Sequence, residues 1–198
     1  MILAFALSSL ISVAQAPGNG WVMAPAPPHE VRRLYWELFE TTEVWVRLTP
    51  GDPDGNPPLV SLVFQAFFPG RAQREAYSLL PQWPRSAPAR LVVRAEPFPI
   101  TAIRDLSLRL ELDGYTFNLT GPGSRYATLS CGDDCAPNAV EAELDPSLLR
   151  ALIVALTVRG EVLGFPIQLA AADQRALGAF AERVGLSAPN ANSSRPTK

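Results

Sequence analysis

The sequence has very little histidine and cysteine, and this shortage removes whole classes of chemistry. Its 198 residues contain one histidine, His29, and two cysteines. A Ser-His-Asp or Cys-His site would depend entirely on His29, which lies in a segment where we expect nothing rigid to hold it against a nucleophile. Zinc is disfavoured for the same reason, because its protein ligands are mainly Cys and His. We therefore expect no catalytic triad, no metal and no cofactor.

Lysine is also scarce, since Lys198 is the only one, and no segment is strongly basic. The formal net charge is -2 and the pI is about 5.5. Nucleic acid and anionic membrane surfaces are therefore poor candidate partners. The abundance of arginine over lysine, together with 20 prolines, indicates a GC-rich and hence bacterial gene. With 47% hydrophobic and 18% charged residues, the chain has the composition of a folded domain.

The sequence contains no apolar run of the length that a membrane-spanning helix needs, about 20 residues. Residues 2–13 form a shorter uncharged apolar run, and the small residues of Ala14-Gln15-Ala16 follow it. This pattern is typical of a signal peptide, although no Lys or Arg precedes the run. We predict a signal peptide over residues 1–16 and export to the periplasm or the exterior, with no stable membrane insertion after cleavage.

The rest of the chain is predicted to form one domain between two irregular segments. Residues 17–29 are rich in Pro, Gly and Ala and indicate a linker, while residues 187–198 are predicted to be a disordered tail. The domain would therefore occupy residues 30–186.

Most of this domain has the pattern of short β-strands. Leu108, Leu110 and Leu112 alternate with polar residues, which predicts one buried and one solvated face, and Asp113-Gly114 is a strong hairpin signal. About seven to nine such strands with regular turn signals favour an antiparallel β-sandwich or open barrel. The predicted strands cover 30–39, 43–48, 59–68, 90–95, 103–112, 115–119, a short segment before Cys131, and a pair at 156–159 and 161–169 that turns at Arg159-Gly160.

Two short helices are predicted near the C-terminus, where they would cover one face or edge of the strands. Asp145 and Pro146 form a helix start, and an apolar stripe that includes Leu149 follows. A closing helix is predicted over about 172–184, with Gly185 as its stop.

Cys131 and Cys135 are the clearest local motif. In an exported chain such a pair indicates a disulfide bond, which would close a small loop and stabilise the fold by roughly 2 kcal/mol. A redox dithiol is the weaker alternative, because Asp133 and Asp134 between the cysteines would raise the thiol pKa values. Free thiols or metal ligands are further alternatives.

Two acidic turns resemble metal sites only superficially. Asp52, Asp54 and Asn56 alternate as in the start of a calcium loop, but Pro57 stands where such a loop needs glycine. Asp133 and Asp134 would need further ligands. A plain turn is the favoured interpretation of both.

A loop between the third and fourth predicted strands offers a candidate binding site. Trp83 and Arg85 lie there among prolines, and an exposed loop tryptophan is often a contact residue. The alternative is that Trp83 folds back over the core. Trp36 and Trp45 are expected to be core residues.

Paired carboxylates are the remaining catalytic possibility. Glu111 or Asp113 would have to approach Glu141 or Glu143, as in a glycan or peptidoglycan hydrolase. The separation of such pairs is not readable from the sequence.

The C-terminal third resembles the invasion-associated locus B family of exported bacterial envelope proteins. The shared features are the close cysteine pair, the helix with Leu148-Leu149, a strand pair that includes residues 164–169, and a final helix through Leu177 and Phe180. The chain lacks the further N-terminal cysteines that the family usually has, and it has Asp134 where the family tends to have glycine. The resemblance implies a β-rich, non-catalytic envelope protein.

The sequence thus favours an exported binding or interaction module whose partner is an unknown protein or envelope component. The alternatives are the carboxylate-dependent hydrolase and a purely structural envelope protein. No part of the sequence predicts which surface binds.

Overall fold

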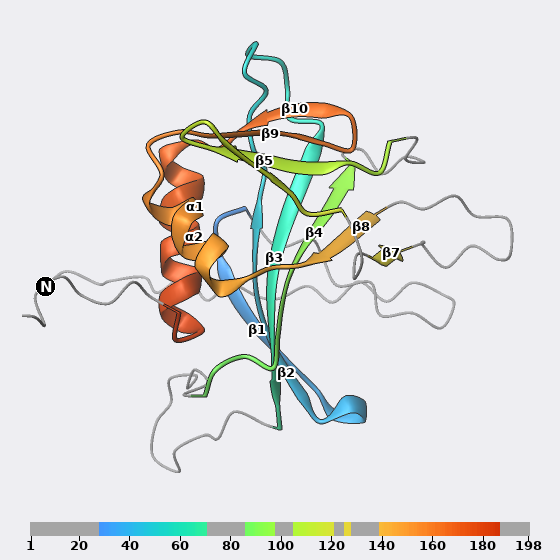
Figure 1. Cartoon of the computed structure of the whole chain (residues 1–198). Helices are drawn as coiled ribbons and strands as arrows, with labels where there is room; N and C mark the ends of the chain where they lie inside the picture. Colours follow the sequence, from blue (N-terminus) through green and yellow to red (C-terminus); the bar gives the residue numbers. More distant parts are fainter. Residues whose placement is uncertain (1–27, 71–85, 98–104, 121–124, 128–138, 187–198) are drawn as a thin grey trace, which may run out of the picture.

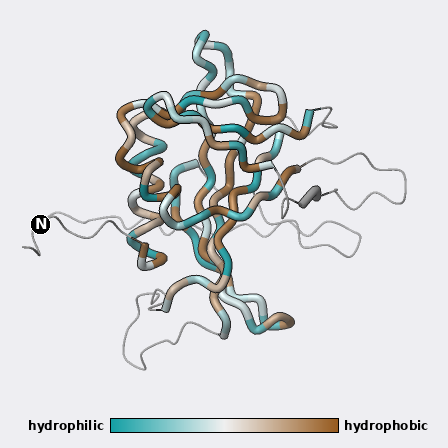
Figure 2. The backbone as a smooth tube through the Cα atoms, viewed as in Figure 1, coloured by the Kyte–Doolittle hydropathy of each residue, from teal (hydrophilic) through white to brown (hydrophobic). Residues whose placement is uncertain are grey.

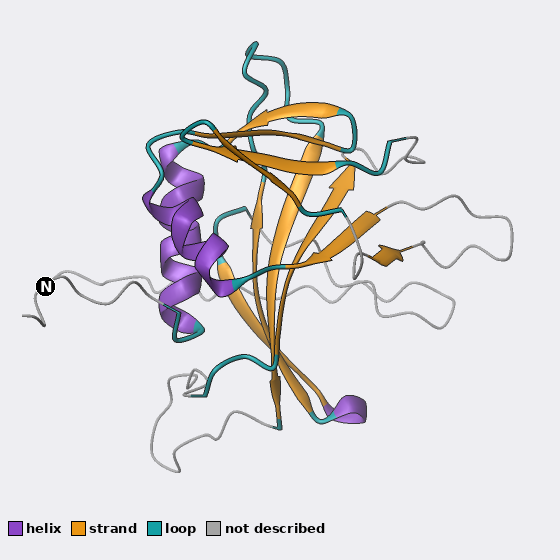
Figure 3. Ribbon diagram, in the orientation of Figure 1, coloured by secondary structure: helices purple, strands orange, loops and turns teal. Residues whose placement is uncertain are grey.

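The computed structural model describes residues 28–70, 86–97, 105–120, 125–127 and 139–186. These residues form two antiparallel β-sheets and two α-helices, arranged like a sandwich (Figure 1; Figure 3). The prediction of a mainly β, antiparallel fold with two C-terminal helices is confirmed. The strands that the structure describes do not close into a barrel.

The larger sheet, sheet A, has six strands in the order β1-β2-β3-β4-β8-β7, and every neighbouring pair is antiparallel. Its first four strands follow one another along the chain as a meander. Their residue ranges are β1 Val31–Trp36, β2 Thr41–Leu48, β3 Val60–Pro69, β4 Arg90–Pro97, β7 Arg125–Ala127 and β8 Ala139–Glu143.

The smaller sheet, sheet B, has four strands in the order β10-β9-β5-β6. They are β5 Leu108–Leu112, β6 Tyr115–Asn118, β9 Val158–Val162 and β10 Phe165–Gln168. Sheet B lies at one end of sheet A, and its strands run across those of sheet A (Figure 1). A bridge joins the loop between β2 and β3 to β10 of sheet B, because the backbones of Gly51 and Gln168 exchange hydrogen bonds of 3.1 and 2.8 Å.

The two helices, α1 Pro146–Val154 and α2 Ala171–Arg183, pack on each other, and α2 packs against β2 and β1. Asp145 caps α1 as predicted, since its side chain accepts a hydrogen bond from the backbone N–H of Ser147. Gly185 follows α2 in the left-handed conformation, with φ of 71°, which is the predicted stop.

The core lies between the sheets and the helices. Alternate residues of β2 and β3 point into it, and Phe64 and Phe180 are completely buried there. Figure 2 shows the hydrophobic colours along the strands and the helices that enclose this core. Burial at about 25 cal/mol per Å² of apolar surface makes these side chains the main source of stability.

The predicted turn at Arg159-Gly160 is wrong. Strand β9 runs straight through Gly160, and the chain turns instead at Leu163 and Gly164, whose φ values are 55° and 80°. This strand position needs a glycine, because a Cβ atom there would lie 2.2 Å from the carbonyl oxygen of Arg109 on β5. The glycine is thus required for a close approach of two strands rather than for a turn.

Several predictions lie outside the described residues. These are the signal peptide over 1–16, most of the linker over 17–29, the tail over 187–198, the disulfide between Cys131 and Cys135, and the candidate binding residues Trp83 and Arg85. In the part of the chain that the structure describes, neither helix has the length and hydrophobicity to cross a membrane.

Candidate functional site

The connection between β1 and β2 exposes a cluster of large apolar side chains. A single 3-10 turn, η1 Glu37–Phe39, joins the two strands at the end of sheet A that lies away from sheet B (Figure 1). We call residues 36–40 the hairpin tip. The exposed fractions are 42% for Trp36, 87% for Leu38 and 70% for Phe39. Figure 2 shows the hydrophobic colour at this tip, far from the core.

Three hydrogen bonds brace the backbone of the hairpin tip. Glu40 has a positive φ of 47°, and its N–H donates to the carbonyl oxygen of Glu37. Its own carbonyl oxygen accepts from the N–H of Gly70, at 2.6 Å, so that the end of β3 braces the turn. The Thr41 hydroxyl donates to the carbonyl oxygen of Phe39, at 2.9 Å. The exposed side chains are therefore presented by a braced turn.

Trp36 is fixed by a second set of contacts, and it is not the core residue that the sequence suggested. The β1–β2 register places Trp36 opposite Thr41, on the face of sheet A that points away from the core. Its indole N–H donates to a carboxylate oxygen of Glu43 at 2.7 Å, and Gln65 donates to the other oxygen at 2.6 Å. Glu43 is only 7% exposed. One side of the indole ring is held while the rest remains open to solvent.

The hairpin tip is also acidic. Glu37 and Glu40 are both exposed, and they flank Leu38 and Phe39 in the chain. The tip thus combines an apolar centre with negative charge at its margin. Aromatic side chains at a fixed position surrounded by polar groups are typical of the residues that contribute most to protein–protein binding.

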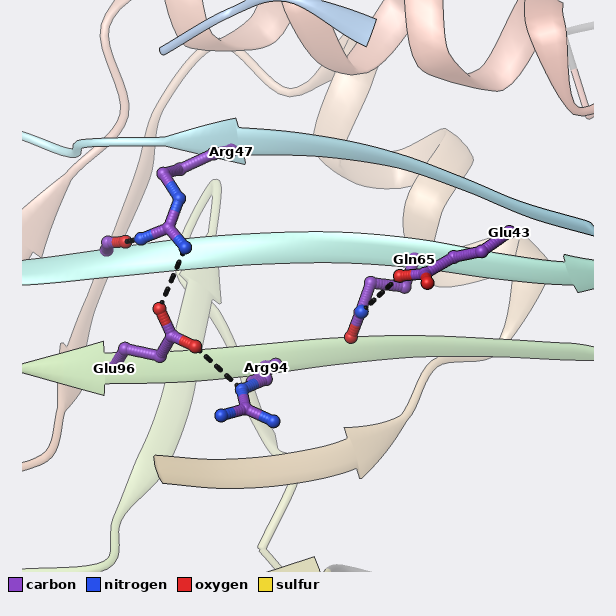
Figure 4. Close-up of polar contacts among 6 residues, drawn as sticks. Glu43, Arg47, Gln65, Arg94 and Glu96 are labelled. Carbon is purple, nitrogen blue, oxygen red and sulfur yellow. Dashed lines mark hydrogen bonds and ion pairs between the residues drawn. The ribbon is translucent and has the colours of Figure 1, made fainter. Parts of the chain in front are cut away.

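Beyond Glu43, the outer face of sheet A carries a network of paired charges. Arg47 donates to the hydroxyl of Ser61 at 2.7 Å and lies 3.0 Å from Glu96. Arg94 donates to the other oxygen of Glu96 at 2.7 Å, so that one carboxylate is held between two guanidinium groups (Figure 4). Because each charge already has a partner within the sheet, these residues stabilise the face and are poor candidates for catalysis.

The next group of charges along this face includes two of the acids considered for hydrolysis, Glu141 and Glu143. Arg90 donates to Glu141 at 2.5 Å, and Glu143 lies 3.9 Å from the same guanidinium group. The guanidinium carbon of Arg90 also lies 5.8 Å from the centre of the Phe67 ring. Both carboxylates of β8 are therefore placed on the outer face of sheet A beside a cation.

The other two candidate acids lie in strand β5 of sheet B and in the turn that follows it. Glu111 is exposed between the buried Leu110 and Leu112, so it points to the outer face of sheet B. Asp113 accepts hydrogen bonds from the backbone N–H groups of Leu156 and Thr157, at 3.2 and 2.8 Å. These bonds, the one from Thr157 above all, lower the pKa of Asp113. The structure thus places Glu141 and Glu143 on the outer face of sheet A, Glu111 on the outer face of sheet B and Asp113 in the β5–β6 turn, and does not bring them into one cleft.

His29 is held more firmly than a linker residue would be. Its backbone N–H donates to the carbonyl oxygen of Arg47 at 2.8 Å, and its Nε2 lies 2.8 Å from a carboxylate oxygen of Asp173. Asp173 is 2% exposed, and its other oxygen accepts from the N–H of Ala170 at the start of α2. The expectation that nothing rigid holds His29 is wrong. The sequence gives no sign of this pair, because its two members are 144 residues apart.

The turn with Asp52 behaves as a turn. The carboxylate accepts from the side-chain amide of Asn56 and from the N–H of Asp54, both at 2.8 Å, and these bonds, the one from Asn56 above all, lower the pKa of Asp52. Across the described ranges, no group of three or more His, Cys, Asp or Glu residues is arranged to hold a metal ion.

Comparison with known protein families, with curated proteins and with solved structures found no match. The resemblance of the C-terminal third to the invasion-associated locus B family remains a prediction from the sequence.

Proposed function

We propose that this protein is an exported, non-catalytic binding module that recognises a protein partner through its hairpin tip. The observation that carries the proposal is the exposure of Leu38 and Phe39, at 87% and 70%, on a turn whose backbone is already fixed. Large apolar side chains in so exposed a place cost solubility and contribute nothing to the core. A partner that buries them provides a physical reason for their presence.

The rigidity of the tip strengthens this proposal. The free energy of binding becomes less favourable when flexible side chains and loops must be ordered, by about 0.5–1.5 kcal/mol for each immobilised side chain. At the hairpin tip, Glu43 already fixes the ring of Trp36 and Gly70 already fixes the backbone of Glu40. The acidic margin indicates the kind of partner, because Glu37 and Glu40 would face Arg or Lys residues around an apolar pocket.

The export part of the proposal depends on the predicted signal peptide and on the predicted pairing of Cys131 with Cys135. Intact-mass spectrometry of the protein recovered from its native cells tests both. We expect a mass that matches cleavage between Ala14 and Pro17, and an increase of about two hydrogens after reduction. An unprocessed and fully reduced chain would overturn the export, and the two cysteines would then have to be considered as chemistry.

The binding part is tested by the size of the native complex. We expect the wild-type protein in a cell extract to elute from a sizing column ahead of the purified protein. The double substitution Leu38→Ser/Phe39→Ser should shift it to the position of the purified protein. Leu59→Ser/Val154→Ser is a matched control, since it removes two other exposed apolar side chains. Equal elution of the tip variant and the wild type in the complex would contradict the proposal.

The hydrolase alternative is testable by single alanine substitutions at Glu111, Asp113, Glu141 and Glu143. If the protein is a binding module, none of these substitutions should change a glycan or peptidoglycan hydrolase signal. A loss of such a signal in two of these variants would favour the hydrolase.

A further inference from the structure

Strand β6 is an edge strand of sheet B with no strand beside its outer edge in the described part of the chain. All four of its residues, Tyr115–Asn118, are exposed. Tyr115 and Phe117 lie opposite the buried Leu112 and Leu110 of β5, yet they are 75% and 36% exposed. The strand therefore presents two aromatic side chains that its own sheet leaves open.

The hydrogen-bond pattern determines which backbone groups of β6 are available. The N–H of Leu119 donates to the carbonyl oxygen of Leu108 on β5, at 2.9 Å. Pairs alternate along an antiparallel ladder, so Phe117 and Tyr115 also bond towards β5. The N–H and C=O groups of Thr116 and Asn118 then point away from β5, towards the free edge. The Asn118 side chain is used elsewhere, because it accepts hydrogen bonds from Thr120.

Natural edge strands are usually protected from pairing by charged residues, proline or bulges. The sequence Tyr-Thr-Phe-Asn of β6 has none of these, and its pairing with β5 is regular over all four residues. An exposed, uncharged and aromatic edge is a template for a further strand.

We propose that β6 pairs with β6 of a second copy of this chain, antiparallel and around a two-fold axis at Phe117. Only this register uses both outward residues, because it places Thr116 of each copy opposite Asn118 of the other as hydrogen-bonded pairs. Phe117 then faces itself across the axis in a non-hydrogen-bonded pair, where side chains are closest. Sheet B becomes one continuous sheet across the two copies.

A second copy fits this edge better than an unrelated segment for two reasons. The edge is complementary to itself, since aromatic residues occupy one face of β6 and Thr116 and Asn118 occupy the other in both copies. It is also electrically neutral, so that two identical edges meet without repulsion. The contact is short, and we therefore expect a dimer that dissociates on dilution. Sheet B lies at the opposite end of sheet A from the hairpin tip, so the tip of each copy stays accessible (Figure 1).

The experiment is sedimentation equilibrium of the purified protein over a wide concentration range, with two matched variants. Thr116→Lys/Asn118→Lys places like charges opposite each other across the axis. Thr116→Glu/Asn118→Lys differs only in the sign of one charge, and it places opposite charges together. Both variants lose the contact between Asn118 and Thr120, so any effect on folding is common to them, and thermal unfolding checks it.

We expect the wild type to dimerise as its concentration rises, the Lys/Lys variant to stay monomeric, and the Glu/Lys variant to dimerise again. A wild type that stays monomeric at all concentrations would overturn the proposal. This is also the result expected if β6 pairs with a strand of another protein instead. Equal dimerisation of the Lys/Lys and Glu/Lys variants would also overturn it. The Leu38→Ser/Phe39→Ser variant should dimerise like the wild type, which separates this proposal from the proposed function.

Discussion

The Nε2 atom of His29 lies 2.8 Å from a carboxylate oxygen of Asp173, and this contact joins the segment just before β1 to the first turn of α2. Asp173 is almost completely buried, and its second oxygen binds the N–H of Ala170. The pair therefore connects the N-terminal edge of the domain to the helix that packs on sheet A. It contributes to the fold, and it gives the single histidine of the sequence a structural role.

The first prediction concerns this pair. We expect Asp173→Ala to lower the free energy of unfolding by about 1–3 kcal/mol, because it leaves the Ala170 N–H and His29 without their acceptor. We expect His29→Ala to cost less, about 0.5–1.5 kcal/mol, because His29 is partly exposed. Urea unfolding of both variants and of the double variant measures the coupling. If the loss of unfolding free energy in the double variant equals the sum of the two single losses, the contact contributes nothing.

The second prediction compares two glycines. At Gly160 a new Cβ atom would lie 2.2 Å from the backbone oxygen of Arg109, so we expect Gly160→Ala to destabilise the protein by about 2–3 kcal/mol. At Gly178 in α2 the new Cβ atom would make an ordinary contact with Ile153, at 3.8 Å. Gly178→Ala should therefore stabilise the protein by about 0.5–1 kcal/mol. Thermal unfolding measures both changes, and equal effects would contradict the described approach of β9 and β5.

The third prediction concerns pH. Hydrogen bonds from Thr157 and Leu156 lower the pKa of Asp113 in the folded protein, so its carboxylate stabilises the fold above its unfolded pKa of about 3.9. This stabilisation is lost as the pH falls through the lower, folded pKa. We expect Asp113→Asn to lower the melting temperature at pH 7, and the difference from the wild type to shrink below pH ~4.

Glu111→Gln is the control for Asp113→Asn, since it removes the same charge from an exposed position nearby. Asn also tolerates the positive φ of 49° at position 113, so the substitution does not strain the turn. A difference between Asp113→Asn and the wild type that stays constant from pH 7 to pH 3 would contradict the role given to the carboxylate.

The features that the sequence predicted well depend on short-range patterns. The alternation around Leu110, the Asp113-Gly114 turn and the Asp145-Pro146 helix start are all confirmed. Each of them is decided by residues within a few positions of one another, where backbone preference and burial agree.

The features that the sequence missed depend on partners far along the chain. Arg159-Gly160 has the residue types of a turn. Only the close approach of the β5 backbone explains why a glycine stands in the middle of β9. Strand β8 was not predicted, because Ala and Glu are weak strand formers and Val140 is its only β-branched residue. Trp36 was expected in the core, and the register with Thr41 places it outside. The hairpin tip follows from that register, which no local pattern determines.

The central claim is that the hairpin tip is the surface that meets a partner, and site-specific photo-crosslinking in the native cell tests it most directly. A benzophenone amino acid replaces Phe39 in one variant and the exposed Ala179 of α2 in the other. We predict one discrete crosslinked product for position 39 after irradiation, and none of that size for position 179. No product at position 39, or the same product from both positions, would contradict the claim.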